Sequence, residues 1–197
     1  MSKSEPHGAK KQSNAVVKWV VTIFFTTIVI SGTISLISEE LMSSSGIAAA
    51  FAILMAIILI GIIFDVVGVA VTSADEVPFH AMAARKVPGA REAIQLLRKA
   101  ERVSSICNDV VGDTCGVVSG SASAAIAVQI LEKFDFSWPK VVSLLMSALV
   151  AGLTVGGKAI GKTFAVNSST TIVHTVGKVI GWFNHVPELF RKKKTKR

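Results

Sequence analysis

The chain has 197 residues, of which 51% are hydrophobic and only 17% are charged, although its formal net charge is +8. A soluble nucleic-acid-binding protein of this charge would carry its basic side chains on one folded face, together with aromatic side chains. Here the basic residues stand between and after long apolar runs, which is typical of membrane proteins. Composition and charge therefore exclude nucleic acid as a partner and predict an integral membrane protein in contact with membrane lipids.

Residues 16–37 form the first predicted span, with Lys18 and Trp19 as anchors at the membrane interface. A secretory signal peptide is the alternative, but its apolar core is only about 7–15 residues long and ends at a small-residue cleavage site. The apolar run here is longer, and no clear A-x-A site follows it. We therefore expect residues 1–15 to be a cytoplasmic tail and residues 16–37 to be a retained transmembrane helix.

Residues 46–71 form the second predicted span, and Asp65 is its only charged residue. A helix needs about 20 apolar residues to cross the hydrocarbon core of a bilayer, so this run is long enough. A carboxylate within such a helix costs free energy unless it contacts protein, water or a cation. Asp65 is therefore a candidate functional residue.

The segment 73–102 predicts two short amphipathic helices at the membrane surface. Ser73 and Glu76 have the spacing of a capping box, and Pro78 would then lie in the first turn of the helix. Pro88 and Gly89 interrupt the pattern, after which apolar residues recur at helical spacing. A plain solvated loop is the alternative.

The third predicted span, residues 103–131, is less apolar and carries acidic, amide and hydroxyl groups. Ser105, Asp109 and Asp113 are four residues apart and would share one face of an α-helix, with Asn108 beside them. Small residues along the helix, such as Gly112, would allow close contact with another helix.

Oxygen ligands of this kind suit a hard cation such as Mg²⁺ or Ca²⁺, whereas zinc and copper prefer thiolate and imidazole groups. We therefore expect Asp65, Asn108, Asp109 and Asp113 to line a divalent-cation site. The alternative stays open that the acids are protonated, or paired with Lys158 or Arg102, and merely hold the helices together.

The fourth predicted span, residues 141–160, overlaps a P-loop pattern, GGKAIGKT, at residues 156–163. A P-loop joins a buried strand to a helix, and this context is missing here, so we expect no nucleotide binding. The chain also shows no nucleophile with a histidine base at a known motif spacing, and its two cysteines have no metal-binding spacing. We therefore expect neither an enzyme nor a bound cofactor.

Residues 166–197 predict an interfacial helix followed by a basic tail, RKKKTKR, which suits a topogenic signal or an anionic-lipid patch. The apolar stripe of that helix would consist of Ile172, Val176, Val179, Ile180 and Phe183, with Trp182 at headgroup level.

Lysine and arginine also predict the orientation of the spans. They are concentrated at both ends of the chain and in residues 85–102, whereas residues 38–45 hold two acids and no base. By the positive-inside rule, both termini and the middle segment lie in the cytoplasm, and the protein is a multi-pass protein of the cell membrane. The predicted fold class is all-α, with four transmembrane helices and juxtamembrane amphipathic helices.

Several of these segments together resemble a known family. The chain reads FDVVGVAVTS at 64–73, RKVPGAREAIQLLRKAER at 85–102, VVGDT at 110–114 and GKAIGKTFA at 157–165. In this order and spacing they resemble the transmembrane domain of the CNNM/CorC (CorB) magnesium and cobalt transport proteins, from Phe64 to about Asn167. The resemblance assigns residues 46–165 to a domain of that kind, makes residues 16–37 an extra helix, and implies a homodimer without the nucleotide-sensing CBS pair of the family.

The chain also departs from the family patterns. In place of the family serine and asparagine it has Asp65 and Asp113, and about two residues are inserted near 104–111. The GExxPKT pattern of the family loses its glutamate to Lys158 and its proline to Gly161. Mapped by position, the resemblance implies ion ligands at Asp65, Asp113 and Gly157.

The function expected from these observations is transport or efflux of a divalent cation, with Mg²⁺ as the transported ion. The alternative is an accessory or regulatory membrane subunit that keeps the fold and does not transport. An enzyme that acts on lipid is a third and more distant reading, because no nucleophile–base set is visible.

Overall fold

The computed structural model describes the backbone of residues 7–43, 45–134 and 138–194, and the side chains of residues 16–42, 45–134 and 138–183. These residues form helices and no strand. The elements are α1 (His7–Ser43), α2 (Ile47–Ser73), α3 (Val77–Ala84), α4 (Ala90–Leu97), α5 (Ala100–Ser105), the π-helix η1 (Ile106–Gly112), α6 (Asp113–Lys133), α7 (Pro139–Asn167) and α8 (Ser169–Lys194). The predicted all-α fold class is confirmed.

Four helical segments are long and apolar enough to cross a membrane, as predicted: Val16–Met42, Ile47–Ser73, Ala100–Lys133 and Pro139–Asn167. They continue past the expected bounds, because helices run on into the headgroup region where polar residues are tolerated. In addition, α1 begins at His7, so that part of the expected N-terminal tail is helical. Residues 1–6 of that tail lie outside the described residues.

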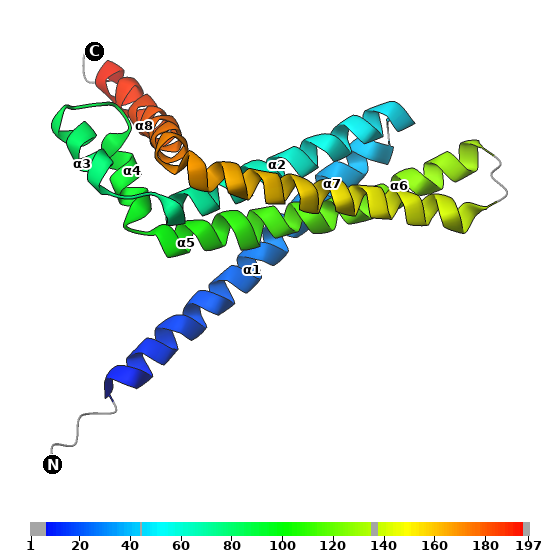
Figure 1. Cartoon of the computed structure of the whole chain (residues 1–197), viewed down its shortest axis with the longest axis horizontal. Helices are drawn as coiled ribbons and strands as arrows, with labels where there is room; N and C mark the ends of the chain where they lie inside the picture. The colour runs from blue at the N-terminus through cyan, green and yellow to red at the C-terminus, as the bar shows by residue number, and fades with distance from the viewer. Residues whose placement is uncertain (1–6, 44, 135–137, 195–197) are drawn as a thin grey trace.

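The three helices α2, α6 and α7 lie side by side and form the bundle, whereas α1 crosses it and diverges (Figure 1). The most apolar window of α1 is not buried at all within the chain. An apolar helix with no protein cover is stable in a membrane because lipid tails are as apolar as leucine. We infer that most of α1 faces lipid.

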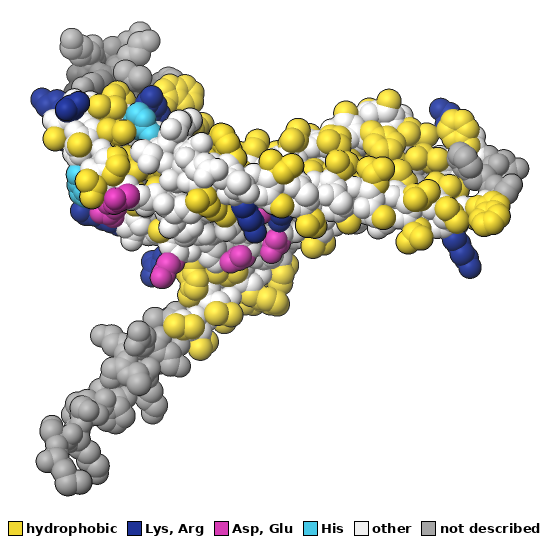
Figure 2. Space-filling model, viewed as in Figure 1, with side chains coloured by type: hydrophobic (Ala, Val, Ile, Leu, Met, Phe, Trp, Pro, Cys, Tyr) yellow, Lys and Arg dark blue, Asp and Glu magenta, His cyan; other side chains and the backbone are white. Residues whose placement is uncertain are grey.

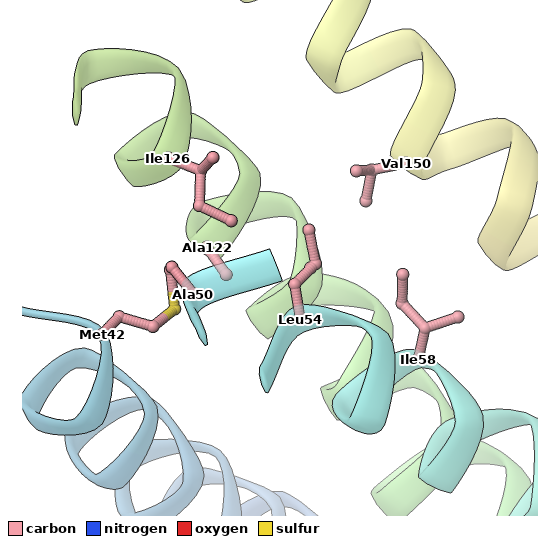
Figure 3. Packing of buried hydrophobic residues seen from close by; sticks show 7 residues of the cluster. All are labelled: Met42, Ala50, Leu54, Ile58, Ala122, Ile126 and Val150. Atoms are coloured by element: carbon pink, nitrogen blue, oxygen red, sulfur yellow. The ribbon is translucent and has the colours of Figure 1, made fainter. Parts of the chain in front are cut away.

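One apolar cluster fills the bundle near the α1–α2 and α6–α7 connections (Figure 3). Inside a membrane such packing contributes through close contact between helices rather than through removal of apolar surface from water. The buried members of this outer cluster are Met42, Ala50, Leu54, Ile58, Ala122, Ile126 and Val150.

At the other end of the bundle, α3, α4 and α8 pack around the ends of α2 and α7 (Figure 1). The buried residues of these five helices form an inner cluster: Ala70, Val71, Phe79, Ala93, Leu97, Ala165 and Val173.

Two glycines bring α4 and α8 together. Gly89, with φ of 83°, lies so close to the backbone of Lys178 that a Cβ atom would collide with it, and a Cβ atom at Gly177 would collide with the Gly89 carbonyl. The predicted turn at Pro88 and Gly89 is confirmed, because α4 begins at Ala90.

The predicted capping box at Ser73 is wrong. The apolar pattern of α2 continues through Ser73, which is the last residue of that helix. Instead, Asp75 Oδ1 accepts a hydrogen bond from the backbone N–H of Val77, the first residue of α3, at 3.2 Å. Pro78 does lie in the first turn of α3, as predicted.

The predicted helix after the fourth span is confirmed as α8, but its packed face differs from the expected stripe. The residues buried against α4 are Val173, Gly177 and Gly181, whereas Val179 and Phe183 are exposed. Glycine lets two helix backbones approach more closely than a branched side chain does. The glycine face of α8 therefore makes the contact, and part of the apolar stripe is left outside.

Candidate functional site

The carboxylate of Asp65 is buried in the bundle, with 4% of its side chain exposed. It is the only charged residue of α2. The Nζ atom of Lys158, on α7, lies 3.5 Å from Asp65 Oδ2, and 17% of the lysine side chain is exposed. The two charges compensate each other, which is the usual condition for ionised groups inside a membrane protein.

Lys158 also reaches the third helix of the bundle. Its Nζ atom donates a hydrogen bond to Asp113 Oδ1, on α6, at 3.1 Å. Asp113 is 71% exposed, so the three side chains lead from the buried Asp65 to the surface. Figure 2 shows acidic and basic side chains next to each other on the flank of the bundle near α1. With two carboxylates and one ammonium group, the site has a formal charge of −1.

Glycines on α7 bring the lysine to this position. A Cβ atom at Gly157 would collide with Ile62 Cδ1, and one at Gly161 would lie 2.8 Å from Val66 Cγ2. Without side chains at these two positions, α7 packs directly on the α2 face that holds Asp65. Gly157, which was predicted as an ion ligand, thus lies beside an apolar side chain of α2.

The π-helix η1 packs against α2 through a reciprocal contact. Asp65 Oδ1 lies against Gly112, where a Cβ atom would collide with it. In the opposite direction, Asn108 lies against Gly68, where a Cβ atom would lie 2.8 Å from Asn108 Cγ. Each helix therefore offers a glycine to a polar side chain of the other. Single π-helical turns are rare and are frequent at functional sites, because they re-aim side chains within a helix.

Two buried oxygen atoms near this contact have no hydrogen-bond partner among the described residues: Asn108 Oδ1 and Thr114 Oγ1. The amide of Asn108 donates from Nδ2 to Ser104 Oγ at 3.1 Å, so that only its oxygen is unpaired. Buried polar atoms are hydrogen-bonded in the great majority of cases, and an exception calls for an explanation such as an ion or a water molecule. Asn108 therefore stays a candidate ligand.

Asp109 does not join the group. It is exposed and accepts a hydrogen bond from Ser105 Oγ at 2.8 Å. Within the part of the chain that the structure describes, it makes no ion pair with Lys158. The prediction of one continuous face assumed α-helical geometry, whereas residues 106–112 form a π-helix with wider turns. The expectation that Asp109 shares a site with Asp65 and Asp113 is therefore wrong in this structure.

The three charged residues lie at one height in the bundle. Asp65 follows the start of α2 by about 18 residues, Lys158 follows the start of α7 by about 19, and Asp113 precedes the end of α6 by about 20. At 1.5 Å per residue these distances are roughly 27, 28 and 30 Å from the same end of the bundle. The site therefore lies in the half of the bundle that is nearer to α3, α4 and α8.

This arrangement makes a polar layer between two apolar clusters. The outer cluster around Leu54 lies on one side of the layer, and the inner cluster around Phe79 lies on the other. The layer is open laterally, where Asp113 is exposed. The two carboxylates of this layer, Asp65 and Asp113, hold the ammonium group of Lys158, and chemically another cation could take its place. Within the described residues, no group of three or more His, Cys, Asp or Glu side chains could hold a metal ion, so additional ligands would come from amide and backbone oxygens or from water.

Sequence reasoning named Lys158 only as an alternative partner of the acids, although it is central to the observed group. A lysine within an apolar span was the signal, because such a residue is costly unless it is paired. The P-loop pattern at residues 156–163 lies inside α7. Its backbone is helical there and does not form the loop that holds phosphates in P-loop proteins.

Comparison of the chain with protein families, with curated proteins and with solved structures gave no match. The resemblance to the CNNM/CorC transmembrane domain therefore stays a prediction.

Proposed function

We propose that this membrane protein transports a divalent cation, with Mg²⁺ as the first ion to test, through the group formed by Asp65, Asp113 and Lys158. The observation that carries the proposal is the buried Asp65 carboxylate, which connects through Lys158 to the exposed Asp113. Ionisable residues inside membrane bundles most often mark ion or proton pathways. Carboxylate oxygens are also the ligands that Mg²⁺ and Ca²⁺ prefer.

In this proposal Lys158 is a tethered cation that competes with the transported ion for the same carboxylates. Its ammonium group lies 3.5 Å and 3.1 Å from the two oxygens. A bound Mg²⁺ has twice the charge and approaches oxygen to about 2.0–2.1 Å, so its Coulomb attraction is roughly three times larger, against the cost of removing its water. Exchange of Lys158 for the ion is thus physically reasonable.

The path of the ion follows from the position of the site. By the positive-inside rule the end with α3, α4 and α8 is cytoplasmic, so that both termini lie in the cytoplasm and the site opens near the inner surface of the cell membrane. The outer cluster, centred on Leu54, Ile126 and Val150, separates the site from the other side. Transport would require these side chains to move apart. The homodimer implied by the family resemblance stays a prediction as well.

Flux of Mg²⁺ into liposomes that contain the purified protein tests the proposal. Asp65→Asn removes the buried charge, and we expect it to abolish flux. Asp109→Asn is the matched control, because it makes the same chemical change at an acid that is not paired with Lys158; we expect it to keep flux near that of the unmodified protein. Equal flux for both variants, with both folded, would reject the site.

A second candidate function is an accessory subunit that does not transport. Two observations favour it: Lys158 already compensates the buried carboxylate, and apolar clusters lie on both sides of the polar layer. Purification of the protein from its native membrane distinguishes the two functions. A partner present in fixed stoichiometry, together with no Mg²⁺ flux from the folded isolated chain, would favour the accessory subunit.

A further inference from the structure

One side of α1 is polar and is turned toward the bundle. From Trp19 to Met42, the α1 residues that the rest of the chain covers at least in part recur every three or four positions, and the others are exposed. Such a recurrence marks a single side of an α-helix. The exposed side is mainly apolar, with residues such as Ile28 and Leu36. The covered side includes four hydroxyl residues, which are Thr27, Ser31, Ser35 and Ser38.

The seam between this side of α1 and the bundle has a contact at each end. At the end nearer to the inner cluster, the guanidinium group of Arg102 lies over the Trp19 ring, 5.4 Å from its centroid. At the end nearer to the outer cluster, Gln129 Nε2 donates a hydrogen bond to the Met42 carbonyl at 3.4 Å. The helix α1 therefore runs in the same direction as the continuous helix α5–η1–α6. Because α1 diverges from the bundle toward its N-terminus, the seam is widest near Trp19 (Figure 1).

Two hydroxyl groups meet at one height of this seam. Ile34 of α1 packs in one cluster with Val118 of α6. Ser31 lies one turn before Ile34, and Thr114 lies one turn before Val118. Residues one turn apart share a side of their helix, and both helices run in the same direction. Ser31 and Thr114 therefore face the seam at about the same height.

The hydroxyl oxygen of Thr114 is buried and has no hydrogen-bond partner among the described residues, and only 3% of the residue is exposed. A threonine in a helix can donate to the carbonyl one turn back, as Thr154 does at 2.8 Å. Thr114 instead follows the π-helix, where the N–H of Asp113 bonds to the Asn108 carbonyl five residues back. The carbonyls of the preceding turn are thus shifted from their α-helical positions. The partner of Thr114 has to come from the seam.

We propose that the seam between α1 and α6 binds water, and that one water molecule joins Thr114 Oγ1 to the hydroxyl group of Ser31. An internal water molecule needs about two to four polar partners, and each hydroxyl group can both donate and accept. A lipid acyl chain is the competing occupant, but it offers these hydroxyl groups no hydrogen bond. Water enters at the wide end near Trp19, so that α1 is one wall of an aqueous seam. The proposal does not depend on cation transport, because it uses none of the residues of the Asp65 site.

Thermal unfolding of the full chain tests the bridging water molecule. Thr114→Val keeps the shape of the side chain and removes the hydroxyl group. Because the water molecule then loses a partner, we expect the melting temperature to fall by about 2–6 °C. An unchanged or higher melting temperature would overturn the proposal, since removal of a hydroxyl group that is simply unpaired does not destabilise a protein. Thr33→Val is the matched control, because Thr33 lies on the exposed side of α1 and bonds to the Val29 carbonyl of its own helix at 2.7 Å; its melting temperature should change by less than about 2 °C.

Cysteine accessibility tests whether water enters the seam. Cys107→Ala and Cys115→Ala remove the two native cysteines, and Thr27→Cys then places a single thiol in the seam. Ile28→Cys is the matched control on the exposed side of α1. The protein is reconstituted into lipid vesicles, with a small charged methanethiosulfonate reagent on both sides of the membrane. Thr27→Cys should react at least about tenfold faster, because the thiolate is the reactive form and does not form in an apolar environment. Equal rates would overturn the proposal, because lipid would then fill the seam.

Discussion

The carboxylate of Asp65 lies directly against Gly112 of the facing π-helix, and the contact exists only because Gly112 has no side chain. A polar group and a glycine thus face each other across two helices. One turn further along, Asn108 and Gly68 repeat the contact in the opposite direction. The geometry of the candidate site therefore depends on glycines as much as on the charged residues.

Gly112→Ala should destabilise the protein by about 1–3 kcal/mol, because the new methyl group would collide with Asp65 and lie 3.2 Å from the Cys107 carbonyl oxygen. Gly116→Ala is the matched control one turn away. Apart from the adjoining residues and the backbone of the same helix, no atom lies within 4 Å of a Cβ atom at Gly116, so the alanine should stabilise the helix by about 0.5–1 kcal/mol. Thermal unfolding in detergent measures both. A Gly112→Ala protein as stable as the control would show that the Asp65 contact is wrong.

The ion pair of Asp65 and Lys158 should behave as a coupled unit. Lys158→Met leaves a buried carboxylate unpaired and should cost about 3–5 kcal/mol. Combining it with Asp65→Leu replaces the pair by apolar groups and should recover most of that loss. A double-mutant cycle on unfolding free energies measures the coupling. Additive effects of the two substitutions would contradict the pairing.

Binding of Mg²⁺ should be stronger once its competitor is removed. In Lys158→Met the two carboxylates have no internal cation, so Mg²⁺ should raise the melting temperature more than it does in the unmodified protein. At a Mg²⁺ concentration of 100 times the dissociation constant, the expected stabilisation is about 2.7 kcal/mol. Lys162→Met is the control, because this lysine is exposed and lies one turn away on the same helix. An identical Mg²⁺ response in both variants would count against competition at the site.

The outer cluster should be sensitive to truncation although the whole helix is apolar. Leu54 is 1% exposed and packs against α6 and α7 (Figure 3), whereas Leu59 is 53% exposed on the same helix. We expect Leu54→Ala to cost about 2–5 kcal/mol through the cavity it leaves. Leu59→Ala should change stability by less than about 0.5 kcal/mol, since lipid fills the space. Similar costs for the two variants would mean that Leu54 does not pack inside the bundle.

A side chain at Gly177 should break the contact between α8 and α4. Gly177→Ala places a methyl group on the Gly89 carbonyl and 3.2 Å from Ala93 Cβ, so α8 should separate from α4. Gly181→Ala serves as a control, since the nearest atoms there belong to Glu92 at 3.4 Å, an ordinary contact. Hydrogen exchange of residues 169–183 should increase at least about tenfold in the first variant only. Unchanged exchange in Gly177→Ala would show that the two helices are not in this contact.

Local patterns predicted much of this fold. Apolar runs of 20 residues or more identify transmembrane helices without any knowledge of their neighbours, because the thickness of the membrane sets the length. The helix ends near Pro78 and Gly89 followed from backbone restrictions that each residue carries with it. The end of α2 was misjudged, since a serine that suits an N-cap also fits the last turn of a helix that has not yet ended.

The candidate site was only partly predictable. Asp65 stood out because a single acid in an apolar helix has few explanations. Asp109 was misplaced because the π-helix, which no simple pattern of residues announces, changes the register between positions 105 and 113. The packed face of α8 was misjudged for a related reason: hydrophobic periodicity marks the apolar stripe, whereas the contact was made by glycines.

By itself, the sequence determined that this protein has four segments long and apolar enough to cross a membrane, and that these segments carry charges in need of partners, because hydrophobicity and charge are properties of each residue. Only the tertiary structure decided which partners meet. Lys158 reaches Asp65 and Asp113 because glycines let α7 and the π-helix approach α2, and the distance between helices depends on side chains that are far apart in the chain.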